Sequence, residues 1–222
     1  MILYIVATPI GNLKDLSLRA IETLKEVDFI LAEDTRVTVK LLNHYEIKTP
    51  LVSYFQHSSL KKNDYIIGLL KQGKNLALVS DAGTPGINDP GGKLIEEVIK
   101  KLSGSVKIIP IPGPNAAIAA LSISGFNADK FLFLGYPPHK KGRQKFFKEI
   151  VDSRYPVVFY ESVHRIIRSL KELVSFESLK SREIVVCREL TKKFETIYRG
   201  KIEEIISQIE KEKLGEFVIM VS

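Results

Sequence analysis

Three turn-rich loops, each following an apolar strand-like segment, contain residue types that can hold a ligand against the main chain. They span residues 7–13, 80–92 and 112–117. Proline fixes φ and glycine adopts conformations closed to other residues, so main-chain groups in such loops can closely approach a ligand. In open parallel sheets, ligands bind beyond the carboxyl ends of the strands. We therefore expect the three loops to contribute to one ligand site.

The middle loop gives the strongest indication, because it has four glycines and two prolines in thirteen positions. A simple connection rarely needs so many special backbone conformations. Asp81 follows the strand, where its carboxylate can accept hydrogen bonds from a ligand, and Gly83 and Thr84 offer close main-chain contact. Asn88 or Asp89 is also suited to capping the next helix. The first loop alone is equally compatible with an ordinary turn, and the third with close helix–sheet packing.

Candidate acid–base residues follow two other strand-like segments. Asp34 and Arg36 follow the strand at 29–32, where they can bind a polar substrate or move a proton. The alternative is a helix start capped by Asp34. His57 follows the strand at 51–55 and can act as a base near neutral pH, or it is an exposed loop histidine.

Polar groups also follow two strand-like segments in the second half. Glu161 can accept a hydrogen bond from a ligand amine or hydroxyl, and Arg165 falls in the first turn of the next helix. The segment 188–193 contains Glu189, a third candidate base, and Lys192, which can hold a phosphate or a reacting ribose.

The densest basic stretch, residues 139–148, contains Lys140, Lys141 and Arg143 together with two phenylalanines. Such side chains can bind RNA phosphates while aromatic rings stack on bases. A solvated helix start with its phenylalanines in the core is the alternative. The formal net charge of +7 favours an anionic partner.

Several functional classes lack their sequence signals. The chain has neither a G-x-G-x-x-G nor a P-loop pattern, and its four histidines show no zinc spacing, so we expect no metal site. The single cysteine, Cys187, lies in an apolar run typical of a core strand and favours a reducing cytoplasm. We identify no signal peptide and no membrane-spanning segment.

The elements that must position these residues alternate between strand and helix. In the first half we expect strands at 2–7, 29–32, 51–55, 76–80 and 106–111, and helices at 16–27, 38–44, 64–71 and 92–102. In the second half we expect strands at 131–134, 157–160, 183–187, 195–198 and 217–221, and helices at 116–124, 166–174 and 202–209. Apolar strands alternating with helices predict a mostly parallel first sheet covered on both faces. The connections of mixed length predict a mixed second sheet. The Pro112–Gly113–Pro114 turn divides the α/β chain into expected domains at 1–112 and 113–222.

These segments together resemble the tetrapyrrole methylase superfamily, and most closely its ribosomal RNA cytidine 2′-O-methyltransferase branch. The matching segments, in chain order over nearly the whole sequence, are residues 8–13, 32–36, 80–85, 112–116, 160–165 and 188–193. The resemblance implies two α/β domains with S-adenosylmethionine in the cleft between them, a homodimer, and 16S ribosomal RNA or the small ribosomal subunit as partner. Many members continue past the last strand, whereas this sequence ends at Ser222.

The resemblance also carries expectations for individual residues. It implies that the donor contacts Pro9, Ile10, Ala82, Gly83, Thr84, Ile87, Asn115, Ala116 and Glu161, and the position of Asp81 at a strand end adds that residue to the expected donor contacts. The substrate-binding candidates are Arg36, Lys140, Lys141, Arg143, Arg165 and Lys192, and the candidate bases are Asp34, His57 and Glu189. Two alternatives stay open, namely methylation of a tetrapyrrole or other small molecule, and an RNA-binding module without catalysis.

Overall fold

A computed structural model describes residues 1–55, 60–211 and 214–222 of the chain. The chain forms two units, Met1–Asn115 and Ala116–Ser222. The division falls just after the Pro112–Gly113–Pro114 turn, slightly beyond the boundary expected from sequence. His57 lies outside the described residues.

The first unit is built on a five-stranded sheet in the order β3-β2-β4-β1-β5. All four strand pairs are parallel, which confirms the predicted parallel sheet. Parallel order places the carboxyl ends of the strands along one edge, so the loops that follow them emerge together. The strands are β1 (Ile2–Val6), β2 (Phe29–Ala32), β3 (Leu51–Ser53), β4 (Leu76–Val79) and β5 (Lys107–Ile111).

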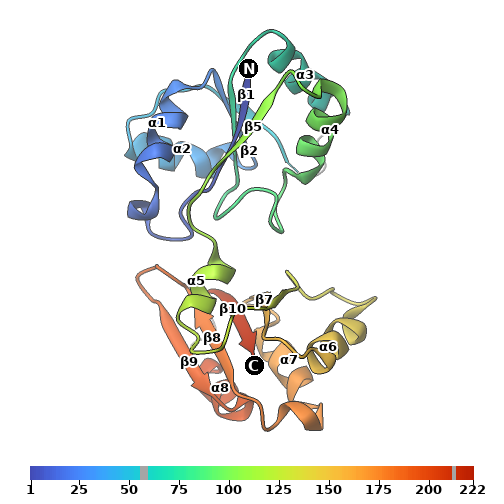
Figure 1. Ribbon diagram of the computed structural model, residues 1–222. Helices are drawn as coiled ribbons and strands as arrows, with labels where there is room; N and C mark the ends of the chain where they lie inside the picture. The colour runs from blue at the N-terminus through green and yellow to red at the C-terminus, as the bar shows by residue number, and fades with distance from the viewer. Residues whose placement is uncertain (56–59, 212–213) are drawn as a thin grey trace. The chain divides into compact units, whose positions relative to one another are not determined.

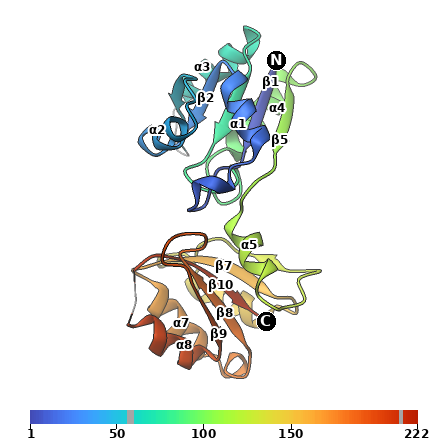
Figure 2. The same ribbon diagram turned by 90° about the vertical axis from the view of Figure 1, so that its left-hand side faces the viewer.

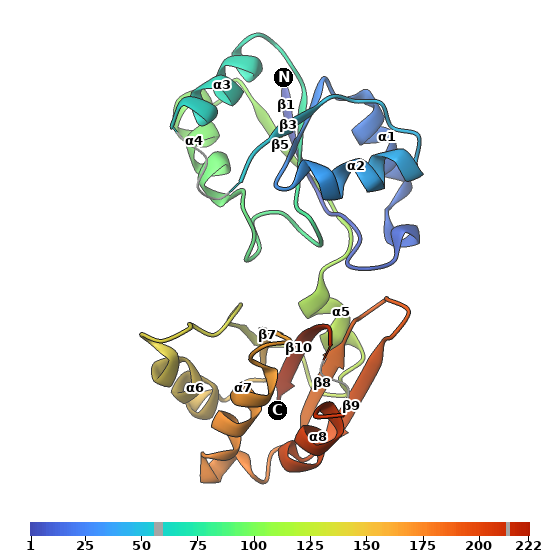
Figure 3. The ribbon, with the colours of Figure 1, turned by 180° about the vertical axis from the view of Figure 1, so that it is seen from behind.

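Helices cover both faces of this sheet (Figures 1 and 3). The helices α1 (Leu18–Glu26) and α2 (Thr35–His44) lie on one face, and α3 (Leu60–Lys71) and α4 (Gly92–Leu102) lie on the other. Strand β4 shows why the strands are apolar throughout, because alternate residues enter opposite cores. Leu76 and Leu78 pack with α3 and α4, while Ala77 and Val79 pack with α1 and α2.

The second unit contains a mixed sheet in the order β6-β7-β10-β8-β9. Strands β6 and β7 pair in parallel, and the other three pairs are antiparallel, as the sequence predicts. Its strands are β6 (Leu132–Phe133), β7 (Val157–Ser162), β8 (Ile184–Arg188), β9 (Thr196–Gly200) and β10 (Glu216–Val221). Short 3₁₀ helices are η1 (Leu13–Asp15) in the first unit and η2 (Glu177–Leu179) in the second.

One face of the mixed sheet is covered by α6 (Arg143–Asp152), α7 (Ile166–Val174) and α8 (Ile202–Ile209), whose apolar sides form a single core with the strands. The short helix α5 (Ala116–Ser122) lies on the opposite face (Figure 2). Cys187 is fully buried in β8, and burial raises the pKa of its thiol to about 12. The prediction of a core cysteine is therefore confirmed. None of the helices described is long and apolar enough to cross a membrane.

Candidate functional site

The first and second predicted loops are joined through their main chains at the carboxyl edge of the parallel sheet. Thr8 N donates to Gly83 O at 2.8 Å, and Gly83 N donates to Thr8 O at 3.0 Å. The buried Thr8 hydroxyl also donates to Ser80 O at 2.9 Å. A threonine in the first loop therefore binds the end of β4 and the loop that follows it.

The third loop packs against the other two. The Thr84 hydroxyl donates to Pro114 O at 3.1 Å, which links the second loop to the third. A Cβ atom placed on Gly113 would lie 3.0 Å from the Cβ of Ala7, so only glycine fits comfortably against the first loop. Loops far apart in sequence thus meet in one place within the first unit, as strand-end placement predicts.

Backbone conformation at this junction depends on glycine at Gly83, whose φ is +85°. A side chain there would be strained, because L-residues rarely adopt this conformation. Its Cβ would lie 3.6 Å from Ile10 Cγ2, in ordinary contact. The ten expected donor residues differ in exposure. Pro9, Ile10, Gly83 and Glu161 are buried, Thr84, Asn115 and Ala116 are half-buried, and Asp81, Ala82 and Ile87 are exposed.

Four carboxylates surround the end of β4 in the first unit. Asp81 Oδ1 accepts a hydrogen bond from Asp34 N at 3.0 Å, which joins the loops after β4 and β2. Burial, followed by repulsion from Asp81, Asp89 and Asp34, raises the pKa of Glu33. Burial also raises the pKa of Asp89 to about 6, and a hydrogen bond with Ser80 acts in the opposite direction. The electrostatic repulsion between Glu33 and Asp89 was not predicted from sequence, because it depends on residues that follow different strands and meet only in the folded protein.

Asp34 caps helix α2 by accepting from Arg36 N at 2.9 Å, so the capping interpretation of Asp34 is confirmed. The helix begins at Thr35, earlier than expected, because the cap precedes it. Asp34 Oδ2 also binds Arg36 Nη2 at 2.6 Å. The hydrogen bonds from Arg36 lower the pKa of Asp34 to about 2. Such a weakly basic carboxylate is poorly matched to general-base catalysis near neutral pH.

Glu161, an expected donor contact, is fully buried in β7 and binds groups of the second unit. Its Oε1 accepts from Ser162 N at 2.7 Å and pairs with Arg165 Nε at 3.0 Å. Its Oε2 accepts from the Ser169 hydroxyl at 2.5 Å. Arg165, an expected substrate contact, is thereby tied to Glu161, and its side chain is 16% exposed.

The three basic side chains predicted for phosphate contact differ in position. Lys140 and Lys141 are exposed just before α6. Arg143 is only 4% exposed, and its Nε binds Glu172 Oε2 at 2.7 Å. Its guanidinium also lies over the Phe147 ring, 5.0 Å from the centroid. This placement favours a structural role for Arg143 and leaves the two lysines for an anionic ligand.

The candidates Glu189 and Lys192 lie together after β8. Glu189 Oε1 accepts from Lys192 Nζ at 3.0 Å and from Glu216 N at 2.9 Å. Burial opposes ionisation of Glu189, but these hydrogen bonds prevail and lower its pKa. Like Asp34, Glu189 is therefore a weak proton acceptor in this arrangement.

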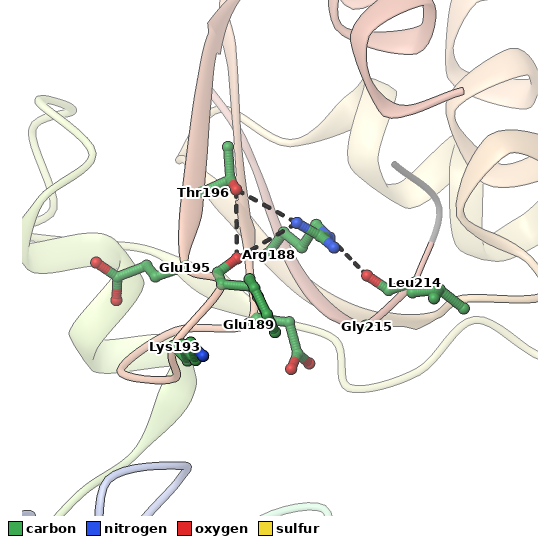
Figure 4. A pocket seen from close by; sticks show the side chains of 8 residues that line it. Arg188, Glu189, Lys193, Glu195, Thr196, Leu214 and Gly215 are labelled. Carbon is green, nitrogen blue, oxygen red and sulfur yellow. Dashed lines mark hydrogen bonds between the residues drawn. The ribbon is translucent and has the colours of Figure 1, made fainter. Parts of the chain in front are cut away.

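A pocket of about 620 Å³ lies beside this pair (Figure 4). Arg188 spans it and donates to the main-chain oxygens of Leu214 at 2.5 Å and Phe194 at 3.3 Å. The lining residues are Arg188, Glu189, Lys193, Phe194, Glu195, Thr196, Leu214 and Gly215. Within residues 1–55, 60–211 and 214–222, no group of three or more His, Cys, Asp or Glu could hold a metal.

A parallel α/β unit with converging strand-end loops, followed by a mixed α/β unit, defines the class of the tetrapyrrole methylase fold. The chain belongs to the family described as Tetrapyrrole (Corrin/Porphyrin) Methylases, whose sequence model matches residues 2–206. It is thus a member of a methyltransferase family, as the sequence resemblance implies.

Individual sequence relatives give a more specific comparison than the family model. The chain is 44% identical over 221 residues to "Ribosomal RNA small subunit methyltransferase I" of Thermotoga maritima, covering 99% of this chain and 97% of the relative. It is 46% identical over 222 residues to the protein of that name in Bacillus subtilis, covering 99% and 74%. A solved cobalt precorrin-4 methyltransferase superposes with a TM-score of 0.71 at 16% identity, covering 100% of this chain and 94% of that one. The last likeness supports the fold alone.

Proposed function

We propose that this protein transfers a methyl group from S-adenosylmethionine to the 2′-hydroxyl of a cytidine in 16S ribosomal RNA. The observation that carries the proposal is the similarity over 99% of this chain, at 44% and 46% identity, to proteins named ribosomal RNA small subunit methyltransferase I. The converging loops of the first unit supply a surface of the kind a small-molecule donor needs. The substrate is ribosomal RNA, free or within the small subunit.

The loops fit the donor by shape and chemistry. Gly83 and Gly113 allow the loops to pack closely against one another, and the exposed Asp81 can accept hydrogen bonds from hydroxyl or amino groups. Bound there, S-adenosylmethionine supplies an activated methyl group. The nearby carboxylates of Asp81 and Glu33 favour a cationic donor electrostatically. The remaining proposed donor contacts are Pro9, Ile10, Ala82, Thr84, Ile87, Asn115 and Ala116.

Positioning supplies much of the rate of such a transfer, since the attacking oxygen must approach the methyl carbon in line with the bond that breaks. A ribose hydroxyl is a weak nucleophile until a base removes its proton. Asp34, His57 and Glu189 stay the proposed proton acceptors, although the lowered pKa values of Asp34 and Glu189 weaken these two carboxylates as bases. Asp34 also orients Arg36, whose side chain is 88% exposed and free to reach a phosphate beyond its pairing with Asp34.

The RNA side of the reaction is assigned to basic groups, of which Lys140 and Lys141 are exposed and Lys192 is half-buried beside Glu189 and Glu216. Lys140 and Lys141 precede α6, and Lys192 follows β8. Their charges suit phosphate contacts, which supply much of the affinity of proteins for RNA. We also propose that the protein works as a homodimer, following the family resemblance, and sedimentation of the purified protein tests this assembly.

A labelled-methyl assay tests the function directly. The purified protein is incubated with labelled S-adenosylmethionine and, separately, with bare 16S RNA, assembled small subunits and tetrapyrrole precursors. We expect label in RNA, resistant to alkali at one cytidine because a 2′-O-methyl group blocks cleavage there. Label in a tetrapyrrole alone would contradict the proposal. Donor binding without transfer to any acceptor would instead favour a non-catalytic RNA-binding protein.

A further inference from the structure

Two arginines hold the loop that carries the exposed lysines. Pro138 O accepts from Arg143 Nη1 at 3.1 Å, and Pro137 O accepts from Arg165 Nη1 at 2.9 Å. Proline has no N–H, so these residues can form main-chain hydrogen bonds only through their carbonyl groups. Consecutive carbonyls bound by separate guanidinium groups fix the direction of the chain as it enters Lys140.

Both arginines are linked to a single carboxylate, that of Glu161. Arg165 Nε binds Glu161 Oε1 directly at 3.0 Å. Arg143 Nη2 donates to the Ser169 hydroxyl at 2.7 Å, and that hydroxyl donates to Glu161 Oε2 at 2.5 Å. Each carboxylate oxygen of Glu161 is therefore linked to one of the two arginines that hold the loop, directly to Arg165 and through the Ser169 hydroxyl to Arg143.

Burial makes this network unlike a surface ion pair. Glu161 is 0% exposed and Arg143 is 4% exposed. Taking charges out of water is costly, and well-packed apolar residues often stabilise a fold as well as a buried ion pair does. The neighbouring core already has apolar side chains from α6 and α7, including Ile150 and Leu170. We therefore attribute to this network the positioning of the chain around it rather than added stability.

The geometry that it fixes is that of the basic loop. Arg143 N donates to Lys140 O at 3.3 Å, so the buried arginine also closes the turn that presents Lys140 and Lys141. We propose that Glu161 is a positioning residue for RNA binding, acting through Arg143 and Arg165 on the loop 136–142. This role rests on the proposed function for its ligand, and it replaces a direct contact between Glu161 and the methyl donor.

The variant Glu161→Gln tests the role by separating substrate affinity from turnover. We expect the KM for RNA to rise about tenfold, the scale of losing one or two phosphate contacts at moderate salt. We expect kcat and the calorimetric affinity for S-adenosylmethionine to stay near those of the unaltered protein. Glu177→Gln is the matched control, since it removes a carboxylate from an exposed ion pair of the same unit. A large loss of donor affinity in Glu161→Gln alone would overturn the proposal.

A direct readout of the loop is independent of RNA. Hydrogen exchange at residues 139–142 should accelerate in Glu161→Gln, while exchange in β8 and β10 stays slow. If Glu161→Gln fails to fold, Ser169→Ala removes the link to Arg143 with a smaller change and should loosen the same residues. Unchanged exchange in a folded variant would overturn the positioning role.

A double-variant comparison connects the loop to binding. In a Lys140→Gln/Lys141→Gln background, adding Glu161→Gln should change the KM for RNA little, because both changes act through the same contacts. Fully additive effects would overturn the proposed route through the loop. If the lysine changes leave RNA binding intact while Glu161→Gln still loosens the loop, the RNA contact assigned under the proposed function is the part that fails.

Discussion

Thr8 and Gly83 exchange two main-chain hydrogen bonds, of 2.8 Å and 3.0 Å, at the carboxyl edge of a parallel sheet. The pair forms an isolated antiparallel bridge between loops that follow β1 and β4. Because Gly83 has a φ of +85°, the bridge depends on a residue without a side chain. This junction underlies the donor surface that we propose.

Gly83→Val should abolish S-adenosylmethionine binding measured by calorimetry. The side chain would be strained at positive φ and would project among Ile10 and Pro114. Gly73→Val is the matched control, because Gly73 has a φ of +88° with no atom within 4 Å of an added Cβ. Both variants should lose similar thermal stability, and only Gly83→Val should lose the donor. Equal donor affinity in the two would refute the assignment of this loop.

Asp34→Asn should lower turnover with little change in donor affinity. Asparagine still caps α2, so the helix should persist. It cannot, however, form the charged pair that holds the Arg36 guanidinium. Steady-state kinetics with RNA and calorimetry with the donor measure the two effects separately. Full activity would exclude Asp34 both as the base and as the support of Arg36.

Asp89→Asn should stabilise the protein at neutral pH. The folded protein raises the pKa of Asp89 from 3.8 to about 6, mainly by burial, so it binds more protons than the unfolded chain between these values. Stability from this group is therefore full below about pH 4 and falls as the pH rises to about 6. We expect the variant to gain about 1 kcal/mol in unfolding free energy at pH 7, after allowing for solvent screening.

Denaturant titrations from pH 3.5 to 7 measure this difference, which should vanish at the acidic end. The exposed Asp15 provides the control, since Asp15→Asn removes one carboxylate from the surface of the same unit. A constant difference between Asp89→Asn and the unaltered protein at every pH would show that the carboxyl charge is not its cause.

Lys140→Gln/Lys141→Gln should make RNA binding less sensitive to salt. Each phosphate contact contributes roughly 0.7 to 0.9 to the slope of log affinity against log salt concentration, so losing two should reduce that slope by about 1.5. Fluorescence anisotropy with a labelled 16S fragment over a range of salt concentrations gives the slope. Arg143→Gln should mainly lower the stability of the fold rather than change the salt dependence, because the Arg143 guanidinium is buried. An unchanged slope in the lysine variant would remove the basic loop from the RNA interface.

Much of the architecture was predictable from local patterns. The isoleucines of α8 repeat at helical spacing, and the structure buries Ile202, Ile205 and Ile209 as expected. Helices α4, α7 and α8 have the predicted bounds. The apolar strands indicated a sheet covered on both faces, because polar and apolar residues stop alternating along a strand when both of its sides are buried. The order of the strands, by contrast, required knowledge of long-range pairing.

The site was predictable only in part. Glycine and proline after each strand indicated the three loops, because parallel strands bring their carboxyl ends to one edge. The partners of the long charged side chains were not predictable. Arg143 belongs to a basic stretch in sequence, yet it is buried against Glu172 on another helix. Spacing along the chain carries no information about which distant carboxylate such a side chain meets.

The sequence by itself determined where strands, helices and sharp turns form, since side-chain burial and backbone preference act over a few residues. Tertiary structure alone decided which charges are paired, which carboxyl groups resist ionisation, and which lysines stay exposed to solvent. Those properties depend on distances and burial between segments remote in the chain. Asp89 illustrates the difference, because its pKa of about 6 arises from burial and from the charge of Asp81, and only folding creates either.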